Sequence, residues 1–195
     1  ILVTSTSSSS LLFGKVLAGA TAILFQLGLI FSSVLGAYHM NRDTLGGMLD
    51  MLLDIPADVL VTFAVFGLGG FLIYAFMYGA LGALVSKIED LNKSAGTAQM
   101  LVMIIYFVVL FQMQAPDGII MKVLSFLPIS SYSAMFIRIA MGTVAVWEII
   151  LAAVILYASV VGMGFIAAKI FRNSTLRYGN PIKLTNALKG LHSRD

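Results

Sequence analysis

The stretch that decides the fold is Val59–Val85, which reads VLVTFAVFGLGGFLIYAFMYGALGALV. It contains no Asp, Glu, Lys or Arg over 27 residues. An α-helix rises about 1.5 Å per residue, so about 20 apolar residues cross the hydrocarbon layer of a bilayer, which is about 30 Å thick. Backbone groups in lipid must find hydrogen-bond partners within their own segment. The stretch therefore predicts a transmembrane helix that is long enough to tilt.

The composition of the whole chain points to the same environment. Of its 195 residues, 59% are hydrophobic and 11% are charged, and none is Cys. Soluble domains carry about 25% charged residues, and so few charges cannot cover the surface of a soluble domain of this size. The net charge of +3 offers no electrostatic footprint for nucleic acid, and the lack of Cys excludes disulfides and thiolate metal sites. We expect an integral membrane protein that does not bind nucleic acid.

Four apolar runs predict four membrane-spanning helices in an all-α, polytopic membrane protein. Their approximate bounds are 16–38, 59–85, 97–115 and 144–170. The runs are continuous and lack the alternation of membrane β-barrel strands. They form a predicted transmembrane domain, residues 16–170, between a cytoplasmic segment, residues 1–15, and a basic cytoplasmic tail, residues 171–195.

The distribution of charge predicts the orientation in the plasma membrane. Half of the twelve Lys and Arg residues lie from Lys169 onward, and the positive-inside rule places this tail in the cytoplasm. Four spans then place residues 1–15 and 86–96 inside and the acidic segment 39–58 outside. Because the first residue is Ile1 rather than Met, we expect the start to be a cut in a longer polypeptide.

Residues 116–138 differ from the four runs. They read PDGIIMKVLSFLPISSYSAMFIR and are interrupted by Pro116, Gly118 and Pro128. Each half is too short to cross a bilayer, and both ends lie outside in this topology. The pattern favours a re-entrant hairpin, helix–break–helix, that enters the outer leaflet and returns. The alternative is an amphipathic loop that lies on the membrane surface.

Polar side chains at membrane depth are few, and they are the candidates for a translocation path. They are Gln26, Ser33, Gln112 and Gln114. Such side chains are compatible either with a path or with hydrogen bonds between helices. The small residues of the second and fourth runs, among them Gly70, Ala158 and Gly162, favour close helix packing.

Three charged residues lie nearest to the hydrocarbon on the predicted outer side: Lys122, Arg138 and Glu148. A charge at this depth is costly unless it is paired or hydrated, which makes each a functional candidate. The alternative is that each side chain extends to the interface. We expect Arg138 to pair with Glu148, and these two residues, with Pro128, are the candidates for an outer gate.

Catalytic and metal-binding groups are scarce. His39 and His192 are predicted on opposite sides of the membrane, so they cannot contribute to one metal site or one hydrolase centre. The sequence contains no GxxxxGK[ST] phosphate loop. We therefore expect a chain that is not an enzyme, with no catalytic residues, no metal and no cofactor of its own.

Four segments resemble the permease subunits of type-2 ABC exporters, in particular the bacterial sodium-extrusion or multidrug branch. They are ILVTSTSSSSLLFGKVLAG (1–19), YGALGALVSKIEDLNKSAG (78–96), LPISSYSAMFIRIAMG (127–142) and AKIFRNSTLRYGNPIKLTNALK (168–189). The resemblance implies that the four runs are the last four helices of a six-helix permease. It also implies a re-entrant hairpin before the last helix, where the residues themselves place one.

The resemblance further implies partners. In the family, the approach to the third helix forms a coupling helix in a cleft of a separate ATPase subunit, and here this approach is residues 1–15. A second, smaller contact would come from the loop 87–93. The contact candidates in the two segments are Leu2, Thr4, Ser5, Lys87, Glu89 and Asp90. Mg-ATP would then bind to the ATPase, and a second permease copy, identical or different, would complete the pathway within membrane lipid.

We therefore expect the permease subunit of an ATP-driven exporter that works by alternating access. Sodium, a drug, a peptide and a lipid are all open as substrates, although no run holds the mid-depth carboxylate that sodium would favour. A secondary transporter or channel fragment is the main rival, and it requires polar residues at mid-depth and broken spanning helices. A membrane enzyme or assembly factor is the other rival, and it lacks support because catalytic groups are absent from the sequence.

Overall fold

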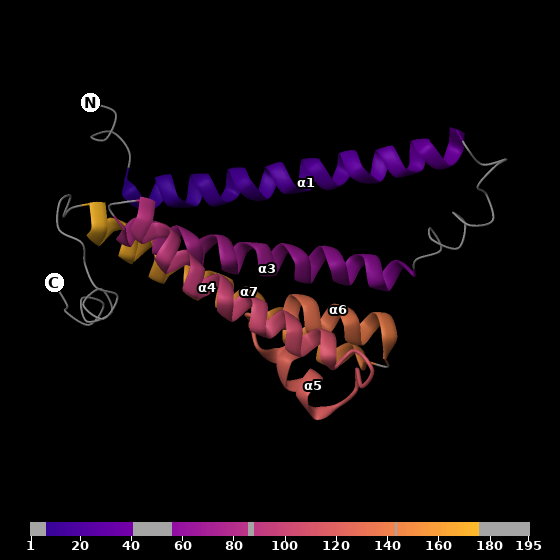
Figure 1. Ribbon diagram of the computed structural model, residues 1–195. Helices are drawn as coiled ribbons and strands as arrows, with labels where there is room; N and C mark the ends of the chain where they lie inside the picture. Colours follow the sequence, from indigo (N-terminus) through magenta and orange to yellow (C-terminus); the bar gives the residue numbers. More distant parts are fainter. Residues whose placement is uncertain (1–6, 41–55, 86–87, 143, 176–195) are drawn as a thin grey trace.

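The computed structural model describes residues 7–40, 56–85, 88–142 and 144–175, and the regular secondary structure within them is entirely helical (Figure 1). The helices are α1 (Ser8–Met40), α3 (Ala57–Leu84), α4 (Ile88–Phe111), α5 (Ile119–Phe126), α6 (Ser131–Met141) and α7 (Val146–Thr175). The predicted all-α class is confirmed for this part of the chain.

Three of the four predicted spans are confirmed as apolar helices of membrane-crossing length. They are Ser9–Met40, Val59–Leu84 and Val146–Asn173. With 33 residues, α1 is about 50 Å long, which exceeds the thickness of a hydrocarbon layer. It begins at Ser8, so residues 8–15 of the predicted cytoplasmic segment are helical and continuous with the rest of α1.

The third predicted span, residues 97–115, differs in the structure. Helix α4 begins earlier, at Ile88 in the predicted loop, and ends at Phe111, so its apolar part, Ala95–Phe111, has at most 17 residues. The chain then turns, and the backbone N–H of Ala115 donates to the carbonyl oxygen of Gln112 at 2.9 Å. The following residue, Pro116, disfavours helical backbone before it, which explains why the helix does not reach residue 115.

The core lies where α3, α6 and α7 meet. Its centre consists of Phe66 in α3, Met135 in α6 and Leu156 in α7, whose side chains are fully buried. Helices α3 and α7 approach closely because α3 has glycine at the contact: a Cβ atom built on Gly69 would lie 2.5 Å from Cδ2 of Leu156. Glycine allows this close approach, as expected for helices that associate in a membrane.

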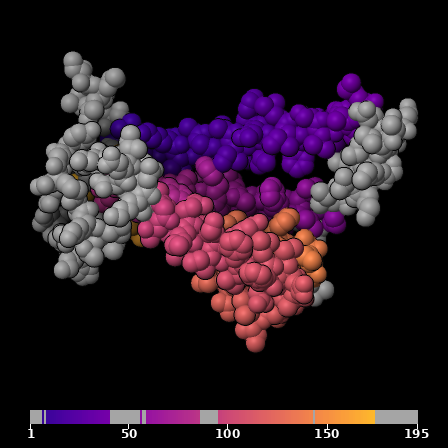
Figure 2. All heavy atoms as spheres, viewed as in Figure 1, coloured from indigo at the N-terminus to yellow at the C-terminus, as the bar shows by residue number. Residues whose placement is uncertain are grey.

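Helix α1 joins this core only through its first turns. Its buried residues are Leu12, Val16 and Ala20. Beyond Ala20 its side chains are exposed or half-buried, and Figure 1 shows the helix diverging from α3 toward Met40. In the space-filling view, α1 runs along one edge of the molecule and α4 and α5 lie along the opposite edge (Figure 2). The exposed apolar face of α1 is suited to contact with lipid or with further helices.

Candidate functional site: a buried ion pair at the helical hairpin

Helices α5 and α6 pack against each other and form a hairpin. The break between them contains Pro128, and the residue before it, Leu127, has extended backbone with φ −76° and ψ 122°. Proline has no N–H to donate and disfavours helical backbone at the preceding residue. The helix–break–helix order that the sequence predicts is therefore present.

Hydroxyl groups satisfy the carbonyl groups that the break leaves free. The Ser130 hydroxyl is buried and donates to the carbonyl oxygen of Leu124 at 2.6 Å. From α3, the Tyr74 hydroxyl donates to the carbonyl oxygen of Ile129 at 2.6 Å. A buried carbonyl group without a partner is costly, so the Ser130 bond stabilises the conformation of the break. The Tyr74 bond, which lies at an exposed position, attaches the break to α3.

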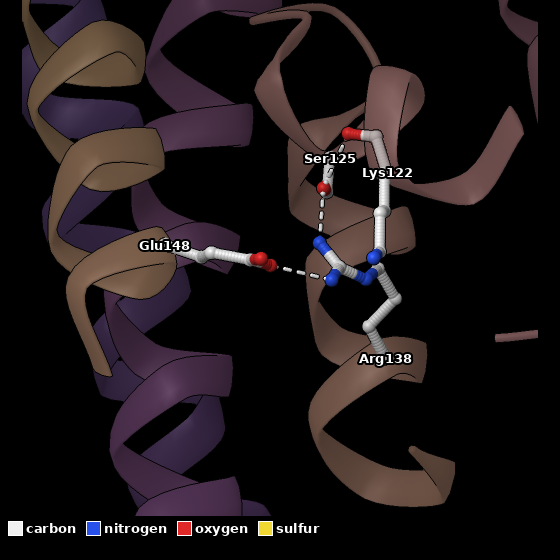
Figure 3. A network of polar contacts seen from close by, with 4 residues as sticks. All are labelled: Lys122, Ser125, Arg138 and Glu148. Carbon is white, nitrogen blue, oxygen red and sulfur yellow. Dashed lines mark hydrogen bonds and ion pairs between the residues drawn. The ribbon is translucent and has the colours of Figure 1, made fainter. Parts of the chain in front are cut away.

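The side chain of Arg138 connects three helices. It lies in the last turn of α6 and is fully buried. Its Nη1 donates to Oγ of Ser125 in α5 at 2.8 Å, and its Nη2 lies 2.5 Å from Oε2 of Glu148 in α7 (Figure 3). The Ser125 hydroxyl in turn donates to the carbonyl oxygen of Lys122 at 2.7 Å. The predicted pairing of Arg138 with Glu148 is confirmed.

The helix ends around the pair stabilise both charges, but the two side chains are buried to different extents. Glu148 lies in the first turn of α7 and Arg138 in the last turn of α6, where the helix dipoles stabilise an anion and a cation respectively. The Glu148 side chain is 15% exposed, whereas that of Arg138 is 1% exposed. Within the described residues, Nε of Arg138 has no hydrogen-bond partner. Among the described residues, the carboxylate that pairs with this guanidinium is that of Glu148.

The four candidates for a translocation path are not brought together. Gln26 and Ser33 are exposed on α1, and the Ser33 hydroxyl donates to the carbonyl oxygen of Leu29 in its own helix at 2.8 Å. Gln112 and Gln114 lie in the turn that follows α4. Helix α1 packs on α3 and α7 and α4 packs on α3 and α6, with no extensive contact between α1 and α4 in the described part.

The predicted ATPase contact falls mostly outside the described residues. This applies to Leu2, Thr4, Ser5 and Lys87. Glu89 and Asp90 lie in the first turn of α4. Figure 1 shows the beginnings of α1 and α4 and the end of α7 at the same end of the molecule.

Two members of the site escaped the sequence reasoning. Ser125 accepts from Arg138, 13 residues away across the break, and Tyr74 of α3 donates to Ile129 within the break, 55 residues away. The sequence does distinguish Ser125, because it is a hydroxyl residue in the otherwise apolar end of the short helix IIMKVLSF. Its partner could not be recognised, because the turn that brings α5 and α6 together sets their relative rotation.

Comparison with known proteins adds an independent finding. Residues 1–169 match the family model described as ABC-2 family transporter protein. The chain is 28% identical over 185 residues to the uncharacterized protein YhaP of Bacillus subtilis (strain 168), which covers 92% of this chain and 44% of that protein. The chain thus spans less than half the length of this relative. No solved structure matches it significantly.

Proposed function

Since the chain belongs to the ABC-2 family of transporter proteins, as a multi-pass membrane component, we propose that it is the permease part of an ATP-driven exporter. The observation that carries the proposal is the family match, which contains α1, α3, α4, α5 and α6 and most of α7. The sequence has no phosphate-loop motif, so Mg-ATP would bind to a separate ATPase subunit. A second permease copy, identical or different, would complete the pathway.

In this proposal, α1, α3, α4 and α7 cross the plasma membrane and the tail lies in the cytoplasm. The six basic residues from Lys169 onward support that orientation. The α5–α6 hairpin would enter the outer leaflet. Its buried polar groups, Ser130 and Arg138, support this position, because irregular backbone at membrane depth requires burial by protein.

The ATPase would contact the cytoplasmic ends of α1 and α4. The candidates are Leu2, Thr4 and Ser5 before α1 and Lys87, Glu89 and Asp90 at the start of α4. Closure of the ATPase would then move α1 and α4, both of which pack on α3. Since Tyr74 of α3 is bonded to the hairpin, movement of α3 would reach the outer side.

At the outer side, Pro128, Arg138 and Glu148 would form a gate. The ion pair holds the hairpin against α7, so outward release requires the hairpin and α7 to move together or the pair to separate. Gln112 and Gln114 precede the hairpin and would line the path there, with Gln26 and Ser33 on α1. The segments quoted above favour the sodium-extrusion or multidrug branch, and the substrate itself stays open.

The ATPase contact is tested by co-purification with a candidate ABC ATPase subunit produced in the same cells. Deletion of residues 1–7, which precede α1 and leave the buried Leu12 in place, is expected to abolish co-purification, whereas Gln114→Ala, in the turn after α4, is a control that leaves it intact. Co-purification that survives the deletion contradicts the coupling assignment.

Export is tested in inverted vesicles that contain both subunits and a panel of sodium, lipophilic drugs, peptides and lipids. Accumulation is expected with Mg-ATP and not with a non-hydrolysable analogue. Accumulation driven by an ion gradient without ATP would instead identify a secondary transporter.

A further inference from the structure

A pocket of about 420 Å³ is lined by residues of α1, α3 and α7. Figure 1 shows the beginning of α1 and the end of α7 at the same end of the molecule. The walls of the pocket are apolar: Leu12 and Val16 come from α1, Phe71 from α3 and Phe171 from α7. The volume lies within the range of about 300–1,000 Å³ that is typical of pockets for small molecules.

The pocket exists because α3 has small residues where the other two helices pass. Ala75, Gly79, Gly82 and Ala83 line it and recur at three- and four-residue spacing, which places them on one face of α3. Gly79 also brings α1 close, since a Cβ atom built there would lie 2.8 Å from Cδ1 of Leu12. The helices therefore touch at Gly79 and leave space beside it.

One charged residue, Lys15, is among the described residues that line the pocket, and its side chain is exposed. Lys169 and Arg172 are also exposed, near the end of α7. An apolar pocket that has an exposed lysine among its lining residues is complementary to a molecule with an acyl chain and an anionic headgroup. Basic pockets between membrane helices on the cytoplasmic side bind such headgroups.

We propose that this pocket binds one anionic phospholipid. An acyl chain would occupy the apolar space between Leu12, Phe71 and Phe171, and the headgroup phosphate would pair with Lys15. A bilayer would supply this ligand, because the residues that line the pocket belong to three apolar helices of membrane-crossing length. With the topology proposed above, the bound phospholipid would belong to the inner leaflet. The binding itself does not depend on that topology.

The headgroup contact is tested with the full-length protein, delipidated in a non-ionic detergent. Titration with dioleoyl phosphatidylglycerol is expected to raise the melting temperature in a saturable way. Phosphatidylcholine with the same chains is expected to act at a higher midpoint concentration, and glycerol 3-phosphate to have no effect. Lys15→Gln is expected to raise the phosphatidylglycerol midpoint roughly fivefold, and Lys15→Arg to leave it near the original value. Lys122→Gln, which removes an exposed lysine of α5, is the matched control.

The acyl-chain contact is tested by Ala83→Leu, which places a larger side chain in the pocket. Native mass spectrometry is expected to show phosphatidylglycerol retained by the original protein and lost from this variant. The melting temperature of the delipidated variant shows independently that it folds.

Three results would overturn the proposal. They are equal midpoints for the two phospholipids, an effect of Lys122→Gln as large as that of Lys15→Gln, and phosphatidylglycerol retained by Ala83→Leu. Stabilisation by glycerol 3-phosphate alone would identify a site for free phosphate instead and would equally reject a lipid site. None of these results bears on binding of the ATPase or on ATP-driven accumulation, so the proposed function is tested independently of the lipid site.

Discussion

Replacement of Glu148 tests the candidate site most directly. Glu148→Leu removes the carboxylate and leaves the buried guanidinium of Arg138 with the Ser125 hydroxyl as its remaining partner in the described part. Removing one member of a buried ion pair costs about 3–5 kcal/mol, whereas an exposed pair contributes about 0–1 kcal/mol. Because the Glu148 side chain is 15% exposed, we expect the lower end of the buried range, about 3 kcal/mol.

The assay is the free energy of unfolding of the full-length protein in mixed micelles, measured in a double-mutant cycle. Arg138→Met alone, which leaves a partly buried carboxylate, is expected to cost about as much as Glu148→Leu. The double variant is expected to cost no more than either single one, since two apolar residues then replace the pair. The control Lys122→Met changes an exposed cation of α5 and is expected to stay within about 0.5 kcal/mol.

Two results would contradict this expectation. One is that the costs of the two single variants add in the double variant, and the other is that Glu148→Leu costs less than about 1 kcal/mol. Either result would mean that the pair does not hold the hairpin against α7. The role of the pair as a gate is tested separately, by measuring transport. Transport per folded molecule that is unchanged in Arg138→Met and Glu148→Leu would leave the pair as a structural contact alone.

Three further predictions concern packing, the hairpin and orientation. Gly69→Ala is expected to destabilise by about 1–3 kcal/mol in unfolding measurements, because its Cβ would meet a fully buried leucine of α7. Gly162→Ala, where nothing lies within 4 Å, is expected not to destabilise, since alanine favours a helix more than glycine does. Tyr74→Phe is expected to cost about 1 kcal/mol by removing the bond to the hairpin carbonyl, and unchanged stability would show that this bond contributes little. The sequence contains no cysteine, so single cysteines can report the orientation. Asn173→Cys is expected to react with an impermeant maleimide only in inverted vesicles, and Ile119→Cys only in intact cells. The opposite pattern would mean that the topology is reversed.

Much of the site could be anticipated because charge is so scarce in this chain. With 21 charged residues among 195, an arginine and a glutamate close to the hydrocarbon have few possible partners, and the expected pair is present. The bond from Arg138 to Ser125 was not anticipated, since it depends on how α5 folds back across the break. The position of Gln26, exposed on α1, likewise depends on the angle at which α1 leaves α3.

The positions of three long apolar helices and of the break in the hairpin could be predicted from the sequence. Both are local properties: an uncharged run must satisfy its own backbone in lipid, and proline lacks an N–H wherever it stands. Which small residues are covered depends on the tertiary structure. Gly69 packs against Leu156 whereas Gly162 faces open space, although both lie in apolar runs of similar composition. Residue size is encoded locally, but the helix that covers a residue is set by how the helices cross.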